Sequence, residues 1–507
     1  MILNQITFTS LIFMPIVSGF LGCVFPKIFY KIGFFTILLI SLGALIGINQ
    51  DYSYAFQLIG SDGILLSIDA NSLPLIFGSG VVLLMTFLLR KKFFSHYFFQ
   101  ICFVLFSALS ISFLSKDLIS LYIALELTGF SAFLLVADKN DPKSLFNSFQ
   151  YLVGGGLAML IYLIGVIQAF TYTGSFLLDD LINAPSTSLC LIAAGLLTKA
   201  GIFLCGVWVP NVYSNANSQS SAVLSGCVTC AAIAPLSRLS SILEPINSSL
   251  IIIGVLSAIF GALIALLETD DGRTLGWSSV SQLGIAILSP TYGCLYAMQH
   301  GICKSILFLT LNKNSLKTNL YKNSIPKNEN DTENIQELIS ILSYIVAGLS
   351  IAGFPFLTGF ISKGLIKSDL PKEVLLIFNS SALLTSIVYV KLIFSRIKDL
   401  DYMRLTKNSF NFKSKNLPKY LSTQTIVLTF SCIFMIFSSF SNEKFLTYSK
   451  IQTSIVTTLL AIIFYISFIG LVPNKNSIIV RKTMDIIGAP FLIAALLLLN
   501  LTYLKIQ

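Results

Sequence analysis

Four charged side chains lie deep inside long apolar stretches of this chain. Glu126 lies in the run LYIALELTGFSAFLLV and Lys199 in LIAAGLLTKAGIFLCGVWVP, while Lys304 and Lys363 occupy two further apolar stretches. A charge at bilayer depth costs several kcal/mol, so it is kept when it is paired or functional. Together these residues predict a path for protons or ions.

The residue types suit proton transfer. A lysine buried without a partner is readily neutral near pH 7, and a nearby carboxylate restores its charged form. If Glu126 and Lys199 meet across a helix bundle, moving either one changes the proton affinity of the other. A static buried pair that fixes helix register is the alternative. His300 and Lys304 are four residues apart and so share a helix face, and histidine can relay protons near neutrality.

The elements that position these side chains are predicted to be membrane helices. The chain has 507 residues, of which 55% are hydrophobic and 11% charged, whereas a soluble globular chain carries about 25% charged residues. Sixteen apolar segments are long enough, or nearly so, to span roughly 30 Å of hydrocarbon. They cover residues 7–25, 32–49, 72–89, 97–114, 118–136, 146–171, 188–207, 220–237, 249–267, 276–290, 294–312, 338–366, 374–395, 421–440, 453–472 and 487–504. The predicted fold class is therefore all-α and integral to a membrane, with the first segment a retained helix rather than a cleaved signal.

Basic residues divide unevenly between alternate loops. The odd-numbered loops hold 22 Lys and Arg residues, against seven in the even-numbered loops and the C-terminal tail. The positive-inside rule then places both termini on the non-cytoplasmic side. These loops explain the net charge of +10 without a nucleic-acid partner. The longest polar stretches, 313–337 and 396–420, are predicted to be cytoplasmic loops, either solvated or docking surfaces for a partner subunit. Lys391, close to the cytoplasmic end of its helix, is expected to snorkel.

Two of the segments are interrupted by turn residues beside a buried lysine. Gly201 and Pro210 follow Lys199, and Gly353 and Pro355 precede the lysine of the later segment. Broken helices in corresponding halves of a chain point to a transport site. Their irregular backbone is tolerated where it is buried in protein or faces a water-filled cavity. Each lysine is therefore predicted to lie beside a wet polar gap, with a simple packing kink as the alternative.

No cofactor or metal is expected in this chain. Cys227 and Cys230 form a Cys-x-x-Cys without a second cysteine pair or a histidine beside them in sequence. The nine cysteines fall mostly within apolar segments and are predicted to be small packing residues. The sequence has no phosphate loop, dinucleotide fingerprint or iron–sulfur ligand set.

At the charged residues and the breaks, the chain resembles a known family. It is similar to the antiporter-like membrane subunits shared by respiratory complex I, its photosynthetic relatives, membrane-bound hydrogenases and the Mrp multisubunit cation/proton antiporters. The resemblance covers roughly residues 70–395. The matching motifs, in family order, are Leu125-Glu126-Leu127, Thr198-Lys199-Ala200-Gly201, Trp208-Val209-Pro210-Asn211-Val212-Tyr213, the run from Asp271 through Arg273 to Gly284, His300 with Lys304, and the run from Gly353 to Lys363. Within the family, the Trp208 motif looks nearest to the Mrp D-type subunits.

The resemblance implies an architecture and a set of functional residues. The fold would have about 16 transmembrane helices, a 14-helix core plus two C-terminal ones, with two inverted five-helix repeats and broken seventh and twelfth helices. The implied divisions are N-terminal helices over 1–96, the first repeat over 97–240, the second over 249–397 and C-terminal helices over 398–507. The implied proton relay is Glu126, Lys199, His300, Lys304 and Lys363, supported by Asp271, Arg273, Trp208, Pro210, Pro355 and Gly353.

The chain also departs from the family pattern. The eighth-helix lysine is absent, and its position falls on Cys230 or Ala231. Water, or Ser225 with other hydroxyls, could bridge the gap in the relay; otherwise the path is broken. Arg273 stands where lysine is more usual, and Asp271 is its expected partner in a loop ion pair.

Three functions follow from the resemblance. The first is an ion-translocating subunit of a complex I-like NADH- or ferredoxin:quinone oxidoreductase. The second is a subunit of an Mrp-type antiporter that exchanges Na⁺ or K⁺ for protons, and the third is a non-conducting scaffold. All three place the chain among other hydrophobic subunits of a hetero-oligomer in a bacterial inner, thylakoid or organellar membrane. None places redox chemistry in this chain, so membership of an enzyme depends on the host complex.

Overall fold

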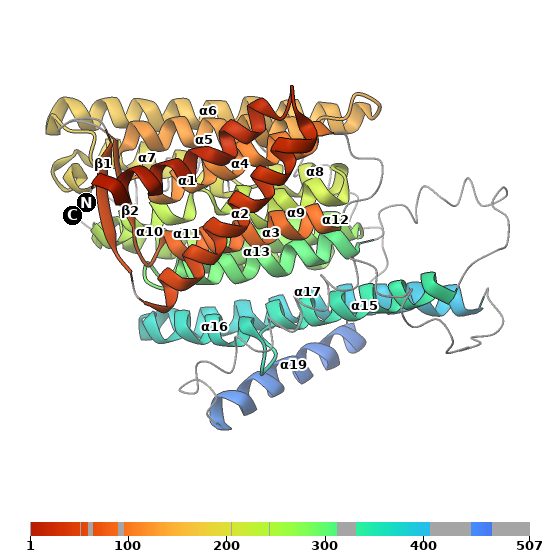
Figure 1. Ribbon diagram of the computed structural model, residues 1–507. Coiled ribbons are helices and arrows are strands. Elements are labelled where there is room, and N and C mark those ends of the chain that lie inside the picture. Colours follow the sequence, from red (N-terminus) through yellow and green to blue (C-terminus); the bar gives the residue numbers. More distant parts are fainter. Residues whose placement is uncertain are drawn as a thin grey trace.

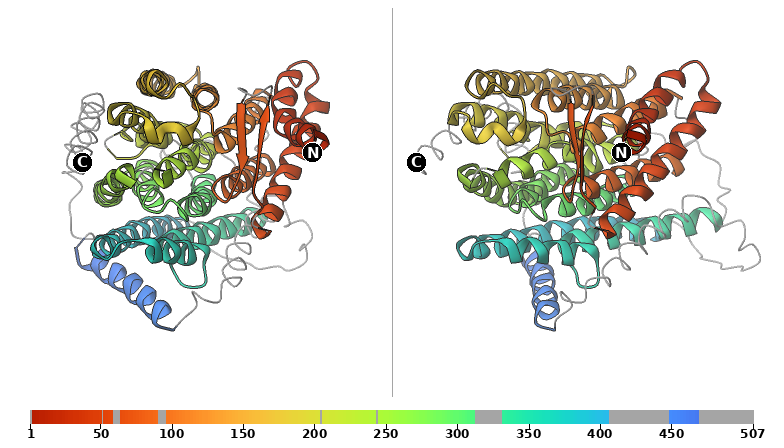
Figure 2. Two further views of the ribbon diagram at one scale, coloured as in Figure 1. Left: turned by 90° about the vertical axis from the view of Figure 1, so that its left-hand side faces the viewer. Right: turned by 60° about the vertical axis from the view of Figure 1, so that its left-hand side comes forward.

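The computed structural model of the protein describes residues 2–50, 52–58, 64–89, 96–203, 205–242, 244–311, 331–405 and 448–468. Within these ranges the chain forms a helix bundle with one small β-hairpin (Figures 1 and 2). Most of the helices run along a common direction, with the hairpin at one end of the bundle (Figure 1). The expected segments 421–440 and 487–504 lie outside the described residues.

The elements follow the predicted segments closely in the first half of the chain. They are α1 Ile2–Leu21, α2 Pro26–Asn49, β1 Tyr54–Leu58, β2 Ile64–Ile68, α3 Ser72–Leu88, α4 His96–Leu114, α5 Leu118–Val136, α6 Pro142–Thr173, the 3-10 helix η1 Leu178–Asn183, α7 Ser186–Ala200 and α8 Trp208–Asn215. Those of the second half are α9 Ser218–Gly226, the 3-10 helix η2 Val228–Cys230, α10 Ile233–Ile242, α11 Glu244–Leu267, α12 Asp271–Ala286, α13 Gly293–Thr310, α15 Asp331–Ala352, α16 Thr358–Asp369, α17 Lys372–Leu405 and α19 Tyr448–Phe468.

Side-chain caps fix where several of these helices begin. The Asp117 carboxylate accepts hydrogen bonds from two backbone amides in the first turn of α5, and Asp141 caps α6 just before Pro142. An aspartate at this position satisfies amides that have no partner within the helix, and proline at the first helical position loses no hydrogen bond. Asp270 caps α12 by accepting from the amide of Arg273. Gly174, with φ +71°, ends α6 in the left-handed region that favours glycine.

Helix α13 lies at the centre of the bundle. It packs against α3, α9, α12, α15 and α16. Figure 1 shows α5, α6 and α7 on one side of this centre and α15, α16 and α17 on the other, with α19 outermost. The side chains of α13 are therefore the ones that both halves of the chain can reach.

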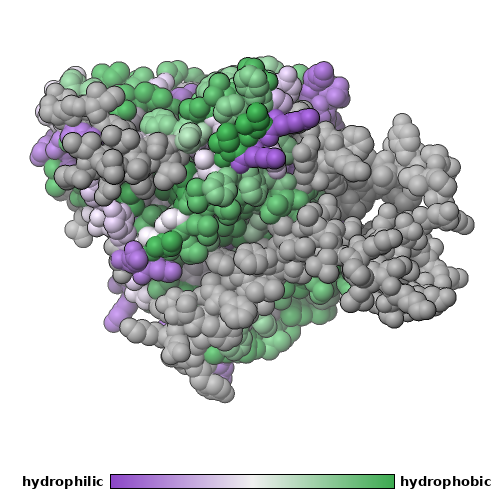
Figure 3. Space-filling model, in the orientation of Figure 1, coloured by the Kyte–Doolittle hydropathy of each residue, from purple (hydrophilic) through white to green (hydrophobic). Residues whose placement is uncertain are grey.

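Burial in this bundle is typical of a membrane protein. Lys304 and His300 are fully buried, whereas Phe20 is 66% exposed and Leu376 80% exposed. Apolar residues cover much of the visible surface of the described part (Figure 3). Eight helices within the described ranges are long and apolar enough to cross a membrane. Apolar side chains on the outside and titratable side chains inside are what a lipid environment requires.

Two local features were not predicted from the sequence. β1 and β2 pair as an antiparallel hairpin in which Tyr54 faces Ile68, although the chain was expected to be all-α; the Asp62–Gly63 pair between the two strands is a common hairpin signal. The eighth segment, 220–237, was expected to be continuous but is interrupted at η2 before α10 begins. Pro235 lies in the first turn of α10, where its missing amide costs nothing.

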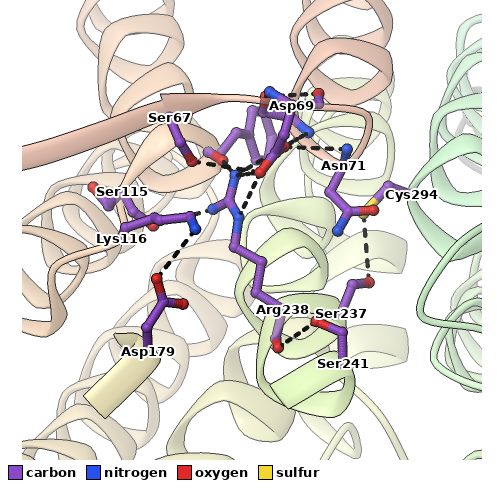
Figure 4. A network of polar contacts seen from close by, with 12 residues as sticks. Ser67, Asp69, Asn71, Ser115, Lys116, Asp179, Ser237, Arg238, Ser241 and Cys294 are labelled. Carbon is purple, nitrogen blue, oxygen red and sulfur yellow. Dashed lines mark hydrogen bonds and ion pairs between the residues drawn. The ribbon is translucent and has the colours of Figure 1, made fainter. Parts of the chain in front are cut away.

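A buried arginine ties together the end of the bundle that carries the hairpin (Figure 4). Arg238 of α10 donates to both carboxylate oxygens of Asp69, at 3.0 and 3.1 Å. It also donates to the carbonyls of Phe113 at 2.6 Å and Ser115 at 3.1 Å. Nearby, Lys116 pairs with Asp179 at 3.3 Å. These contacts join four expected even-numbered loops at one end, in agreement with the predicted alternation of loops.

Candidate functional site

Lys199 and Glu126 meet across the bundle. Lys199 is in the last turn of α7 and Glu126 is in the middle of α5. Lys199 Nζ lies 3.4 Å from Glu126 Oε1 and 3.4 Å from the carbonyl oxygen of Leu125. The lysine side chain is 6% exposed, while that of the glutamate is 37% exposed and reaches the outer surface of the bundle. The ion pair therefore has one buried and one accessible partner.

Glycine residues make room for the Lys199 ammonium group. A Cβ atom on Gly129, one turn after Glu126, would lie 2.7 Å from Lys199 Nζ, and one on Gly155 of α6 would lie 3.5 Å from it. The amine therefore rests against the bare backbone of two helices. Any side chain at Gly129 competes with it for space.

Replacing Gly129 by alanine is expected to lower ion flux about fivefold or more, because the added methyl group displaces the ammonium from Glu126 and overpacking costs about 1–3 kcal/mol. The measurement is flux per assembled complex in proteoliposomes. Gly154→Ala is the matched control, since no atom lies within 4 Å of a Cβ at that position. Equal flux in Gly129→Ala and Gly154→Ala would show that the position of the amine is unimportant.

The break after Lys199 is held by side chains of the core. Gly201 has φ +68° and ends α7, and the indole Nε1 of Trp208 donates to the freed carbonyl of Thr198 at 3.2 Å. The amide of Phe203, within the break, donates to Ser257 Oγ of α11 at 3.0 Å. Pro210 lies in the first turn of α8, where a Cβ on Gly276 would contact it. The irregular backbone is thus paired inside the protein, as a membrane interior requires.

Hydroxyl groups lie next to the position where the eighth-helix lysine is missing. Cys230 and Ala231 are buried at the interrupted helix, and the Cys230 thiol contacts the carbonyl of Ala297. The neighbouring Thr229 accepts a hydrogen bond from Tyr213 Oη at 3.4 Å. Ser225, the residue suggested by the sequence, donates within its own helix to Ala222. Thr229 was not predicted as a site residue, although a threonine beside the missing lysine was the available signal.

The Tyr213–Thr229 pair connects the two halves of the bundle. The Thr229 methyl group would contact a Cβ on Gly201, two residues after Lys199. The ring of Tyr213 packs edge-on against that of Phe308, with 5.5 Å between centroids. Phe308 lies one turn after Lys304 on α13. The hydroxyl pair therefore lies between the first broken helix and the central helix.

His300 and Lys304 share one face of α13, and both are fully buried. Lys304 Nζ donates to the carbonyl of Leu275 at 2.6 Å and lies 5.6 Å from the ring centroid of Tyr389. Neither ring nitrogen of His300 has a hydrogen-bond partner among the described residues. A buried polar side chain without a protein partner is unusual in a folded protein and marks His300 as a functional candidate.

Lys363 lies beside the second break. α15 ends at Ala352, α16 begins at Thr358, and Gly353 between them has φ +91°. Lys363 Nζ donates to the carbonyl of Ala352 at 3.4 Å and to Thr385 Oγ1 at 3.3 Å. Pro355 falls inside this break, so both predicted breaks are present and each adjoins its lysine.

A polar network joins α13 to this break. The side-chain amide of Gln299 donates to Ser350 Oγ at 3.1 Å and accepts from Ser362 Oγ at 3.4 Å. Ser350 Oγ in turn accepts from the amide of Gly359 at 3.3 Å. Gln299 is adjacent to His300 and Ser362 is adjacent to Lys363 in sequence, so the network lies beside both. This network was not predicted from the sequence.

A second ionic cluster lies at the end of the bundle opposite the hairpin. Arg273 Nε donates to Glu268 Oε1 at 2.8 Å, and both side chains are buried. Arg273 also donates to the side chain of Asn211, next to Pro210. Asp271 was its expected partner; Glu268, five residues earlier and before α12 begins, is a further partner that was not predicted. Asp271 accepts a hydrogen bond from Ser395 at 3.4 Å.

The contacts of the Lys391 ammonium group differ from the prediction. It was expected to snorkel toward the interface, but its ammonium donates to the carbonyls of Ala265 at 3.1 Å and Leu266 at 2.9 Å, and to that of Glu268. These are carbonyls at the C-terminal end of α11, which lack partners within the helix. A cation there also interacts favourably with the helix dipole. Lys391 is therefore a cap between α17 and α11.

The arrangement can bind and pass protons. Three buried amines and one imidazole lie on α7, α13 and α16. Among the described residues, Lys199 is the only one of these three lysines with a carboxylate partner. Hydroxyl and amide groups lie between them. Within the described ranges, no group of three or more His, Cys, Asp or Glu residues is arranged to hold a metal ion.

Comparison with known families agrees with this arrangement. The family described as "NADH:quinone oxidoreductase/Mrp antiporter, TM" matches residues 115–387, which is more than half of the chain. The chain belongs to this family. It is therefore an integral, multi-pass membrane protein of the antiporter-like type, as the resemblance predicted. α19 and the first four helices lie outside the matched residues.

Curated relatives come from both branches of the family. Over 273 residues the chain is 28% identical to NADH-quinone oxidoreductase subunit N of Desulforudis audaxviator, covering 49% of this chain and 53% of the relative. Over 382 residues it is 27% identical to the putative antiporter subunit mnhA2 of Staphylococcus aureus, covering 67% of this chain and 47% of the relative. The chain thus spans about half the length of these relatives. The nearer likeness to D-type subunits stays a prediction.

Solved structures share the fold over most of the chain. A subunit of the archaeal membrane-bound sulfane sulfur reductase aligns with a TM-score of 0.71 at 20% identity, covering 90% of this chain and 98% of that one. A subunit of the Mrp complex from Dietzia aligns with a TM-score of 0.69 at 15% identity, covering 89% and 99%. At these identities the likeness establishes the fold.

Proposed function

We propose that this chain is an ion-translocating, antiporter-like subunit of a multisubunit membrane complex, with protons carried by Glu126, Lys199, His300, Lys304 and Lys363. The observation that carries the proposal is the Lys199–Glu126 pair, 3.4 Å apart at the first helix break. It stands at the start of a series of buried amines that lead to the second break. Intramembrane ionisable groups of this kind mark proton relays.

The pair acts as an electrostatic gate. When Glu126 lies next to Lys199, the carboxylate favours the ammonium form, so the lysine holds a proton. Separation of the two groups leaves the amine in a nearly dry site, where desolvation favours release. The proton then passes toward α13 by way of the Tyr213–Thr229 hydroxyls and water. His300 and Lys304 take it up and pass it to Lys363 beside the Gln299 network.

The surface around Glu126 supports a partner subunit. Its side chain is 37% exposed, between Ile123 at 60% and Phe130 at 51% exposure on the same helix. A half-exposed carboxylate among lipid-facing apolar side chains is costly unless another protein covers it. The proposed partners are therefore other hydrophobic subunits, and the transported ions are protons, with Na⁺ or K⁺ as exchanged cations in an antiporter.

The finer architecture belongs to the same proposal. It comprises sixteen membrane helices, with both termini on the non-cytoplasmic side. Two inverted repeats cover residues 97–240 and 249–397. N-terminal helices over 1–96 precede them, and C-terminal helices over 398–507 follow them. A lysine beside a Gly/Pro break in each proposed repeat supports this scheme. So does the gathering of even-numbered loops around Arg238.

A non-conducting scaffold is the second candidate, favoured by the missing eighth-helix lysine at Cys230 or Ala231. The Tyr213–Thr229 hydroxyl pair next to that position favours conduction. Co-purification from native membranes, followed by mass spectrometry and flux assays of the reconstituted complex, tests the proposal. Iron–sulfur and quinone-site partners assign the chain to a complex I-like enzyme, and small hydrophobic partners alone assign it to an Mrp-type antiporter. A chain that purifies without partners contradicts the proposal.

A further inference from the structure

The second helix break exposes backbone carbonyls next to Lys363. Where α15 ends, the chain turns through Gly353, with φ +91°, and Phe356, with φ +63°, before α16 begins. The last carbonyls of a helix have no partners within it. Inside a membrane each unpaired carbonyl costs several kcal/mol, so it must find a donor. The hydrogen-bond donors to these carbonyls therefore determine how rigidly the break is held.

Two carbonyls of the break accept hydrogen bonds from side chains on other helices. The Ala352 oxygen accepts from Lys363 Nζ at 3.4 Å and from Ser386 Oγ of α17 at 3.2 Å. The Gly353 oxygen accepts from Ser454 Oγ at 2.6 Å. Ser454 belongs to α19, about one hundred residues later in the chain and beyond the residues matched by the family.

Packing fixes α19 in this place. Ala461 is fully buried in a small cluster with Ile387 and Val390 of α17. Further along, the ring of Tyr465 stacks on that of Phe394, with 5.4 Å between centroids. Figures 1 and 2 show α19 on the outer side of the bundle, where it packs against α17. The Ser454 contact is therefore made by a helix anchored over about three turns.

Lys363 lies against the same stretch of backbone. A Cβ on Gly353 would lie 3.4 Å from Lys363 Cδ and 3.9 Å from its Nζ. The carbonyl that accepts the hydrogen bond from Lys363 belongs to Ala352, the residue just before Gly353. The Ala352 and Gly353 carbonyls belong to successive peptide groups that meet at Gly353, so a shift of the chain at Gly353 would move both the acceptor and the wall of the lysine site.

We propose that Ser454 is a positioning residue for Lys363, and that α19 clamps the second break through the Ser454–Gly353 hydrogen bond. Within the part of the chain that the structure describes, the first break is held differently: its Phe203 amide donates to Ser257 of α11, a helix within the region matched by the family. The second break is thus held by a peripheral helix. This inference rests on the proposed role of Lys363 in ion translocation.

The test compares variants in the complete, assembled complex reconstituted into liposomes. Ser454→Ala is expected to lower ion flux per assembled complex about threefold to tenfold, the effect of losing one part-buried hydrogen bond. Ser454→Thr keeps the hydroxyl group and should restore most of the flux. Thr453→Ala is the control, because this exposed hydroxyl donates within its own helix to the carbonyl of Lys450.

Several results would overturn the inference. Unchanged flux in Ser454→Ala would do so, as would a Ser454→Thr variant as slow as Ser454→Ala, because the hydroxyl would then be irrelevant. A loss of assembled complex without any loss of flux per complex would assign a purely structural role. Lys363→Ala separates the two proposals: if it leaves flux intact, the proposed function fails, whereas if it abolishes flux and Ser454→Ala does not lower it, only the clamp fails.

Discussion

Replacing Lys304 by methionine is expected to lower proton flux by at least about tenfold, equivalent to a barrier higher by about 1.4 kcal/mol, without destabilising the protein. Lys304 is fully buried on α13 and donates to one backbone carbonyl. It forms no ion pair among the described residues. Methionine fills a similar volume but cannot carry a proton. Since an unpaired amine buried in the bundle carries a desolvation cost that methionine does not have, flux and stability should respond differently.

Flux per assembled complex and the melting temperature of the purified complex measure these two effects. Lys367→Met is the matched control, because Lys367 is an exposed lysine in the last turn of α16. A Lys304→Met complex that melts earlier but conducts normally would assign Lys304 a structural role and contradict the relay.

Replacing Arg238 by alanine is expected to destabilise the protein by about 3 kcal/mol. This value is near the lower end of the range for breaking a buried ion pair, because Asp69 is partly exposed. The substitution leaves the Asp69 carboxylate without its guanidinium partner and frees the carbonyls of Phe113 and Ser115. These groups join α10 to the hairpin and to the end of α4. The amount of assembled complex should fall severalfold, as measured by quantitative native electrophoresis of solubilised membranes.

Lys116→Ala provides the comparison within the same region of Figure 4. Its partner Asp179 is 58% exposed and Lys116 itself is 30% exposed, so the loss should stay below about 1 kcal/mol. If both variants assemble equally well, the buried network does not stabilise this end of the bundle.

The sequence predicted the helices because a membrane helix is specified locally. An apolar run of about 20 residues with capping residues at its start predicts its own boundaries. The broken segments were predictable for the same reason, since Gly201 and Gly353 take the left-handed conformations that glycine allows. The buried positions of Lys199, Lys304 and Lys363 followed from the cost of charge in an apolar run.

Contacts between distant segments were not predictable in the same way. Arg238 was assigned to a loop, but its partner Asp69 lies 169 residues away. Lys391 was expected to snorkel, yet it caps a helix that ends more than 120 residues earlier. Ser454 contacts a carbonyl 101 residues before it. In each case the partner is a backbone carbonyl or a single carboxylate, which leaves no periodic signal in the sequence.

The most direct test of the central claim is proton flux through the assembled complex with Glu126 replaced by glutamine. The amide keeps the size and polarity of the side chain but removes the charge that favours the ammonium form of Lys199. We expect normal assembly and a flux lowered by at least about tenfold. A Glu126→Gln complex with wild-type flux would show that the Glu126–Lys199 pair does not gate proton movement, and the proposed relay would then be wrong at its first step.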